Sequence, residues 1–151
     1  MDVRHFRDRR RKEEDDDIVK GKLPADFASE GNIAVSHDEA LALLSVRKQA
    51  VTQIGAPEIQ LDREVVGKCV EYLNTFKTAD IFSSYHKRGE IKNQYDHMNL
   101  TDFEISQLLN LRPKNIDEAR VLITSFERFE SAYDLDELAA ILDIVLRPSA
   151  A

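Results

Sequence analysis

The side chains that could do acid–base chemistry are carboxylates, and two of them, Asp102 and Glu104, lie close together after Thr101. Two carboxyl groups can share general acid and general base roles when their environments hold their pKa values apart. Thr101 lies three positions before Glu104, however, and this spacing is typical of a capping box at a helix start. Acidic residues in a first helical turn also interact favourably with the helix dipole. We therefore predict a capped helix here, and no catalytic carboxylate pair.

Metal-binding and nucleophilic side chains are few and scattered. His86 and His97 lie eleven positions apart, without an acidic or cysteine partner at ligand spacing, so we predict surface residues rather than metal ligands. The single cysteine, Cys69, cannot form an intrachain disulfide, which fits a reducing intracellular compartment. It shares the buried face expected for this helix with Val66, Val70, Leu73 and Phe76, so we predict a small buried hydrophobic residue rather than a reactive thiol.

Other catalytic and cofactor signatures are also missing from the sequence. The five glycines are well separated, which excludes the glycine-rich loops that approach phosphates and dinucleotides closely. The segment from Asn110 to Pro113 could resemble a binding loop, but proline disfavours helix in the residue before it, so we predict helix termination. We predict no catalytic residue, no metal site, no cofactor and no small-molecule substrate.

Length and charge limit the remaining classes. A chain of 151 residues corresponds to about one domain. Its net charge of −7 argues against nucleic-acid binding driven by bulk charge. No apolar run approaches the roughly 18–20 residues of a membrane span, and the N-terminus is charged from the start, unlike a signal peptide. A free nucleic-acid-binding module would need a basic face, for which the best sequence is Lys87, Arg88 and Lys92.

The first third of the chain divides into a charged tail and an irregular arm. Residues 1–12 carry six basic and two acidic residues, and residues 13–17 are all acidic, so we predict that residues 1–17 are disordered in isolation. This tail is either a solvated segment or a nuclear-import signal or docking arm. Residues 18–35 combine apolar positions with Gly21 and Pro24, which predicts an irregular arm that packs on its own domain or on a partner.

The remainder of the sequence predicts an all-α fold. Residues 36–99 are expected to form N-terminal helices, and residues 100–148 a three-helix region. Ser36 with Glu39 predicts a capped helix from Ser36 to Ile54, and Asp62 is the expected cap of the next helix. Residues 77–99 are the least regular part, because Gly89 argues against one unbroken helix. An apolar cluster is expected there from Ile81, Phe82 and Tyr85, extended by Ile91, Tyr95 and Met98.

Three helix starts are expected within residues 100–148, each a small polar residue followed three positions later by Glu. The pairs are Thr101 with Glu104, Asn115 with Glu118, and Asp134 with Glu137. Helical spacing then predicts the core positions, which are Phe103, Leu108 and Leu109, then Ile116, Ala119, Leu122, Ile123 and Phe126, and finally Leu135, Leu138, Ile141, Leu142 and Val145. Pro148 is expected to end the last helix.

Three phrases in this region resemble a known family. They are LTDFEISQLLNLRP at residues 100–113, DEARVLITSF at 117–126 and LDELAAILDI at 135–144. They look like the fourth subunit of eukaryotic RNA polymerase II, whose archaeal counterpart is the polymerase F subunit. Weaker likeness continues upstream in LPADF at 23–27, DEALALL at 38–44 and YLNTF at 72–76, so the match covers roughly residues 13–147. The family usually has a proline near the end of the second phrase, which this chain lacks.

The resemblance implies a fold and a division of labour. The fold of residues 100–148 would be similar to the helicase-and-RNase-D C-terminal (HRDC-like) module. The chain would be a non-catalytic nuclear subunit that pairs with the seventh polymerase II subunit to form a stalk near the RNA exit path. The pair would support initiation and offer a platform for factors, with nascent RNA contacted mainly by the partner. The related stalk subunit of RNA polymerase III is the alternative, because its family shares the LLNxRP phrase.

We expect the partner contact to come from the irregular arm and the first helix. A small helical domain cannot easily bury the apolar residues of such an arm by itself. The candidate partner-binding residues are Leu23, Phe27, Leu41 and Leu44.

Overall fold

The computed structural model describes residues 32–54, 60–77 and 81–148, and these residues form helices without strands. The all-α prediction is confirmed. In chain order the elements are α2 (His37–Ile54), α3 (Gln60–Phe76), α4 (Ile81–Gln94), the 3₁₀ helix η1 (Asp96–Met98), α5 (Asp102–Leu111), α6 (Ile116–Leu122), the 3₁₀ helix η2 (Thr124–Arg128) and α7 (Ala132–Leu146).

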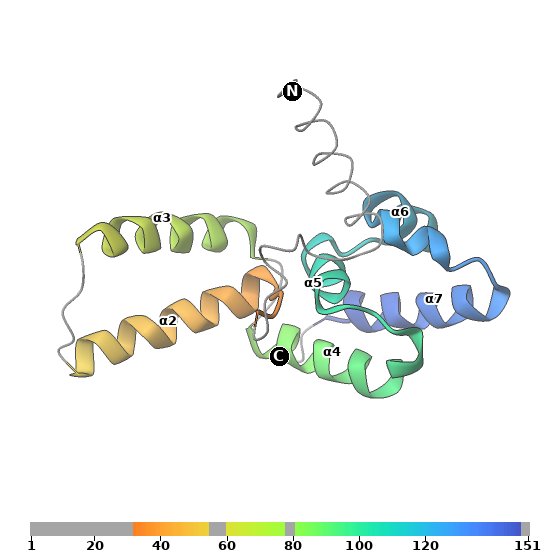
Figure 1. The fold of residues 1–151 in the computed structure, drawn as a ribbon, viewed down its shortest axis with the longest axis horizontal. Coiled ribbons are helices and arrows are strands. Elements are labelled where there is room, and N and C mark those ends of the chain that lie inside the picture. The colour runs from red at the N-terminus through yellow and green to blue at the C-terminus, as the bar shows by residue number, and fades with distance from the viewer. Residues whose placement is uncertain (1–31, 55–59, 78–80, 149–151) are drawn as a thin grey trace, which may run out of the picture.

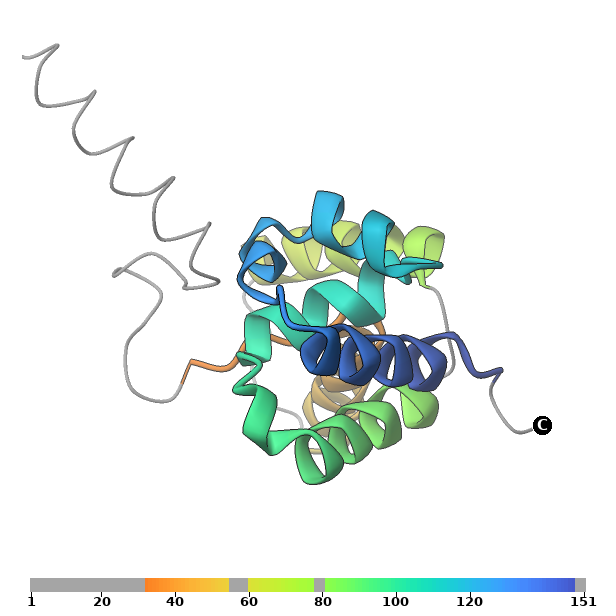
Figure 2. The same cartoon turned by 90° about the vertical axis from the view of Figure 1, so that its right-hand side faces the viewer.

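The helices fall into two groups in space. Helices α2 and α3 lie side by side as a hairpin that projects from one end of the molecule (Figure 1). Helices α4 to α7 form a bundle at the other end, in which α7 packs against α4, α5 and α6 (Figure 2). The hairpin meets the bundle through contacts of α2 with α4.

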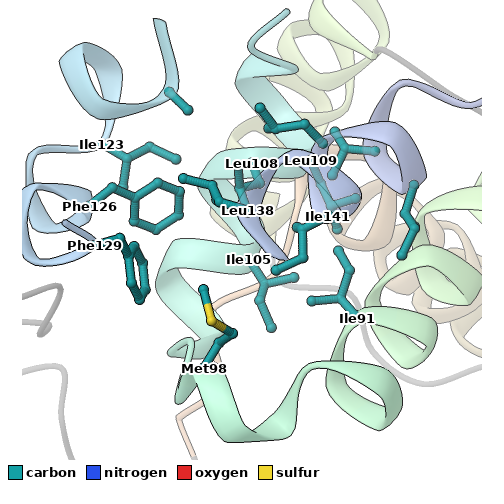
Figure 3. Close-up of a cluster of buried hydrophobic side chains, with 14 residues drawn as sticks. Ile91, Met98, Ile105, Leu108, Leu109, Ile123, Phe126, Phe129, Leu138 and Ile141 are labelled. Atoms are coloured by element: carbon teal, nitrogen blue, oxygen red, sulfur yellow. The ribbon is translucent and has the colours of Figure 1, made fainter. Parts of the chain in front are cut away.

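The hydrophobic core lies inside the bundle. The side chains of Phe126, Leu108, Leu138 and Ile141 are fully buried at its centre, and the Phe126 and Phe129 rings meet edge to face with centroids 5.5 Å apart (Figure 3). The other core members are Ile91, Met98, Ile105, Leu109, Ala119, Ile123, Leu142, Ile144 and Val145. Ile91 and Met98 belong to this core, so residues on both sides of position 100 contribute to it. The predicted boundary between the N-terminal helices and the three-helix region at position 100 stays a prediction.

Two of the expected capping boxes are present in full. At α5, the Thr101 side chain accepts a hydrogen bond from the Glu104 N–H, and the Glu104 carboxylate accepts one from the Thr101 N–H at 2.9 Å. Ser36 and Glu39 make the same exchange before α2, at 3.3 Å and 2.7 Å. Before α6, the Asn115 side chain accepts from the Glu118 N–H, but Glu118 reaches back to the N–H of Lys114 instead.

Two predicted caps are wrong. Helix α7 is capped by Ser131, whose hydroxyl accepts from the Asp134 N–H at 3.1 Å, so Asp134 lies in the first turn. Serine caps as well as aspartate does, and Ala132 and Tyr133 can both continue the helix, so the earlier start adds three residues. Helix α3 likewise begins at Gln60, which places Asp62 inside its first turn.

The predicted core is mostly confirmed, with local errors. Leu122 is 46% exposed, because α6 ends there and the chain continues as the tighter η2, which changes the direction of successive side chains. Phe103 and Leu135 are only partly buried, whereas Ile105 and Ile144, which were not predicted, are almost fully buried. The predicted end of α5 is confirmed, since Arg112 adopts a left-handed conformation with φ of 47° before Pro113.

The hairpin and α4 correct three further expectations. Cys69 is exposed rather than buried, and Phe76, expected on the same buried face, is 52% exposed. The reason is that α3 packs mainly against α2 alone, which leaves most of its circumference in solvent. Tyr85 is 73% exposed, so it does not join an apolar cluster. Helix α4 also runs unbroken through Gly89, whose cost of about 1 kcal/mol is offset by buried neighbours on the same helix.

Candidate partner-binding surface

A buried arginine fastens the hairpin to the bundle. The Arg88 guanidinium on α4 donates to both carboxylate oxygens of Glu39 on α2, at 2.6 Å and 2.7 Å. It also donates to the Asp102 carboxylate at 3.1 Å and to the Ser106 hydroxyl at 2.7 Å, both on α5. Burial alone would raise the pKa of Glu39, but the hydrogen bonds from Arg88 and Ser36 and the Arg88 charge outweigh it and lower that pKa.

Three shorter links fix the same end of α2. Ser84 on α4 donates to the buried Asp38 carboxylate at 2.9 Å. The His37 N–H donates to the side-chain oxygen of Asn110, at the end of α5, at 2.8 Å. The Ser106 hydroxyl lies 3.0 Å from the carbonyl oxygen of Ala34, just before α2. The hairpin is therefore held at the start of α2, while its far end extends away from the bundle (Figure 1).

These links use the side chains that a nucleic-acid-binding face would need. Arg88 and Lys87 are 9% and 7% exposed, and the Lys87 amine donates to the carbonyl oxygens of Val145 and Arg147, at the end of α7. Lys92, the third member of the sequence cluster, pairs with Asp102 at 2.6 Å. The structure therefore gives the cluster an internal role and presents no basic face at these residues.

Glu104 does more than its predicted cap requires. It is fully buried, and both of its carboxylate oxygens pair with the Arg128 guanidinium of η2. Ser125 donates to the same carboxylate at 2.5 Å. Burial alone would raise the pKa of Glu104. The hydrogen bonds from Arg128, Ser125 and Thr101 and the Arg128 charge outweigh burial, so the pKa is lowered and the carboxylate is ionised. This network joins α5 to η2.

The hairpin carries an apolar stripe that faces solvent. On α3, Leu73 is buried, and Val66 and Val70 on the same face are half-buried. A second stripe at the next helical positions is exposed: Val65, Cys69, Tyr72 and Phe76, with Val65, Tyr72 and Phe76 between 52% and 55% exposed. The Tyr72 and Phe76 rings lie 4.7 Å apart, and Tyr72 meets His37 edge to face at 5.8 Å.

Helix α2 and the residues before it carry further exposed apolar side chains. Leu43 and Val46, one turn apart on α2, are 61% and 63% exposed, and Ile33 and Val35 upstream are 65% and 39% exposed. We call the exposed residues Ile33, Val35, Leu43, Val46, Val65, Tyr72 and Phe76 the hairpin surface. Sequence reasoning missed the α3 stripe because it assigned Phe76 to the buried face; the repeated 4–3–4 spacing from Val65 to Phe76 was the available signal.

Two of the four predicted partner-binding residues lie within the described part of the chain. Leu23 and Phe27 lie outside the described residues. Leu41 is 8% exposed and Leu44 is half-buried, so in this structure Leu41 packs within the chain itself. Their role in partner binding stays a prediction. His86 and His97 are at the surface as predicted, and His97 lies 3.7 Å from Glu137.

Two further properties of the described residues concern metal binding and membranes. Within these ranges no group of three or more His, Cys, Asp or Glu side chains is arranged to hold a metal ion. None of the described helices has the length and apolar character needed to cross a membrane.

Comparison with known proteins identifies the family. Residues 34–147 match the family described as RNA polymerase Rpb4. A curated relative from Dictyostelium discoideum, named DNA-directed RNA polymerase II subunit rpb4, is 28% identical over 142 residues, which cover 87% of each chain. The matched region begins at residue 34, just before α2, and includes the α2–α3 hairpin and the whole bundle. The chain belongs to the RNA polymerase Rpb4 family and is accordingly a non-catalytic subunit of an RNA polymerase.

Proposed function

We propose that this chain is the fourth subunit of nuclear RNA polymerase II and that it pairs with the seventh subunit to form the polymerase stalk. The assignment to polymerase II rests on the name of the Dictyostelium relative and on the sequence resemblance. The hairpin surface is the observation that carries the pairing. Folded monomers rarely leave large contiguous apolar patches in water, and such patches are typical of protein interfaces.

Aromatic anchors favour the α3 stripe as the centre of this contact. Tyr72 and Phe76 lie side by side, and aromatic residues dominate the energetics of many interfaces because they bury a large area with few rotatable bonds. The clamp at Arg88 holds the hairpin in one orientation before binding, which reduces the entropy lost on association.

The irregular arm is the second proposed contact. Ile33 and Val35, the described large apolar residues of the arm, are exposed directly upstream of α2, and Leu23 and Phe27 belong to the same arm. In this proposal the partner receives the arm and the hairpin together. Nascent RNA is contacted mainly by the partner, which agrees with the net charge of −7 and with the internal use of Lys87 and Arg88.

Binding of paired variants to the seventh subunit tests the pairing. The double substitution Tyr72→Ser with Phe76→Ser removes exposed rings without opening the bundle core, so the chain should stay folded and lose affinity. Truncating central interface residues typically costs about 2 kcal/mol or more, a loss of about 30-fold each. Leu43→Ser with Val46→Ser tests the α2 side, and both are better probes than Leu41→Ala, which would also disturb the packing of the hairpin.

The matched control is Tyr85→Ser, which removes an exposed ring from α4, outside the hairpin. It should bind the seventh subunit like the unmodified chain. Affinities equal to that of the Tyr85 variant for both the Tyr72/Phe76 and the Leu43/Val46 variants would exclude the helices of the hairpin as the site of pairing.

A further inference from the structure

The face of α6 and η2 that points away from the core contains an open cleft that the proposed pairing does not use. Its volume is about 590 Å³, and it is lined by Asp117, Arg120, Val121, Thr124, Glu127 and Glu130. Val121, the next-to-last residue of α6, is 77% exposed. The cleft thus combines one exposed apolar side chain, Val121, with a rim of charged side chains.

The charge of this rim is not compensated within the described part of the chain. Elsewhere, Glu39, Asp102 and Glu104 each pair with a guanidinium or an ammonium group. Among the described residues, no hydrogen bond or ion pair engages the carboxylates of Asp117, Glu127 or Glu130. Three carboxylates against the single Arg120 leave the cleft at −2, so a complementary occupant is cationic and carries at least one apolar side chain.

One segment of this chain has that chemistry. Residues 1–12, MDVRHFRDRRRK, carry six basic and two acidic residues, which gives +4, and include Val3 and Phe6. No other stretch of similar length in the sequence has a comparable positive charge. This basic segment is also the motif that neither the fold nor the proposed polymerase role explains.

The path of the described chain brings this segment within reach. Ala34 lies against α5, since its carbonyl oxygen is 3.0 Å from the Ser106 hydroxyl. Two positions away on α5, Glu104 bonds Ser125 and Arg128 of η2, and η2 supplies Thr124 and Glu127 to the cleft. Side chains two positions apart point to opposite sides of a helix, so Ala34 and η2 lie on opposite sides of α5, separated by roughly the 10–12 Å diameter of one helix. An extended linker over residues 13–31 can span up to about 60 Å, far more than this separation requires.

We propose that the cleft formed by α6 and η2 binds the chain's own basic N-terminal segment, residues 1–12. Tethering makes the contact intramolecular, so an effective concentration on the order of 1 mM can sustain it even where the isolated contact is weak. The contact depends on opposite charges at an exposed site, so added salt weakens it. This inference does not rest on the proposed polymerase role.

A paramagnetic label on the tail of the full chain tests the proposal. The label is attached to Cys at position 3 in the variant Val3→Cys with Cys69→Ser, and signal intensity is measured for the methyl groups of Val121 and Val65. Both valines are exposed on helices, but Val65 lies on the hairpin. We expect selective loss of the Val121 signal at low salt and its recovery at about 1 M salt, where the Debye length is about 3 Å.

Charge reversal separates the cleft from general attraction to an acidic protein. Glu127→Lys with Glu130→Lys should abolish the selective loss at Val121, and adding Arg9→Glu, Arg10→Glu and Arg11→Glu should restore it. The matched control is Asp136→Lys with Asp143→Lys on α7, both exposed, which should leave the loss unchanged. Equal loss at Val121 and Val65, or no loss at either, would overturn the proposal.

A mixing experiment identifies whose tail is bound. An isotope-labelled chain without the paramagnetic label is combined with a labelled-tail chain that carries no isotopes. Unchanged Val121 intensity in the mixture supports binding within one chain. Selective loss at Val121 in the mixture would show that the cleft takes the segment from a second copy, which contradicts the intramolecular proposal.

Discussion

Arg88 on α4 and Glu39 on α2, 49 residues apart in the sequence, form a two-pronged ion pair with N–O distances of 2.6 Å and 2.7 Å. The side chains are 10% and 9% exposed, so water cannot replace Arg88 as the partner of the Glu39 carboxylate. The ion pair fastens the start of α2 to the bundle, and the proposed partner surface depends on the resulting position of the hairpin.

Loss of this arginine should free the hairpin. Arg88→Met leaves the Glu39 carboxylate buried and unpaired, which typically costs about 3–5 kcal/mol. We expect faster hydrogen exchange along α2 and α3 and a lower free energy of unfolding in urea. Arg147→Met, which breaks the more exposed pair with Glu90, should cost about 0–1 kcal/mol. Similar stability losses for the two variants would contradict the clamp.

The Glu104 carboxylate should make the free energy of unfolding depend on pH. Its pKa in the folded chain is lowered below the ordinary value of 4.5 by Arg128, Ser125 and Thr101, against the effect of burial. Its contribution is therefore complete above pH 4.5 and is lost as pH falls through the lowered folded pKa. Glu104→Gln should cost about 1.5–3 kcal/mol at pH 7, because it weakens charge-assisted hydrogen bonds while the remaining Arg128, 38% exposed, can be hydrated, and much less below the folded pKa. A loss that is the same at both pH values would refute the ionised pair.

Lys87 should hold the end of α7. Its ammonium donates to the Val145 and Arg147 carbonyl oxygens, and burial, with the nearby charges of Arg112 and Arg147, lowers its pKa. Lys87→Met leaves these acceptors without a donor, which costs about 1–3 kcal/mol. We therefore expect faster hydrogen exchange in the last turn of α7. Lys68→Met, on the exposed face of α3, is the control and should leave that turn unchanged.

Helix α7 offers a test of cap assignment. Ser131→Ala should cost about 0.5–2 kcal/mol, because the Asp134 N–H loses its acceptor. Asp134→Ala should cost less, because Asp134 makes no cap contact of its own and only interacts with the helix dipole in the first turn. Thermal unfolding of the two variants gives the comparison, and a larger effect at Asp134 would restore the start of α7 that the sequence predicts.

The comparison of these residues shows what local sequence can predict. Helix existence, the all-α class and most of the core follow from spacing, because amphipathic periodicity reports which face is buried. The predicted cap of α7 is wrong because Ser131 and Asp134 are both good caps, and the exposed Ala132 and Tyr133 between them give no apolar signal that separates the two. Lys87 and Arg88 looked like a basic face because sequence distance hides Glu39 and the end of α7.

The hairpin was the hardest part to predict for a related reason. Cys69 and Phe76 sit at helical spacing with buried residues, so their pattern favours burial. Their exposure results from α3 having one main neighbour, a tertiary property that periodicity does not encode. The buried role of Glu104 was likewise hidden, because its cap alone accounts for its spacing from Thr101.

The most direct test of the central claim is purification of the tagged full chain from its native cells, followed by identification of the bound subunits. The polymerase assignment predicts the seventh subunit in stoichiometric amount together with the large subunits of RNA polymerase II. The Tyr72/Phe76 double variant should lose both, while the Tyr85 variant keeps them. Recovery of RNA polymerase III subunits, or of no polymerase subunit at all, would contradict the assignment.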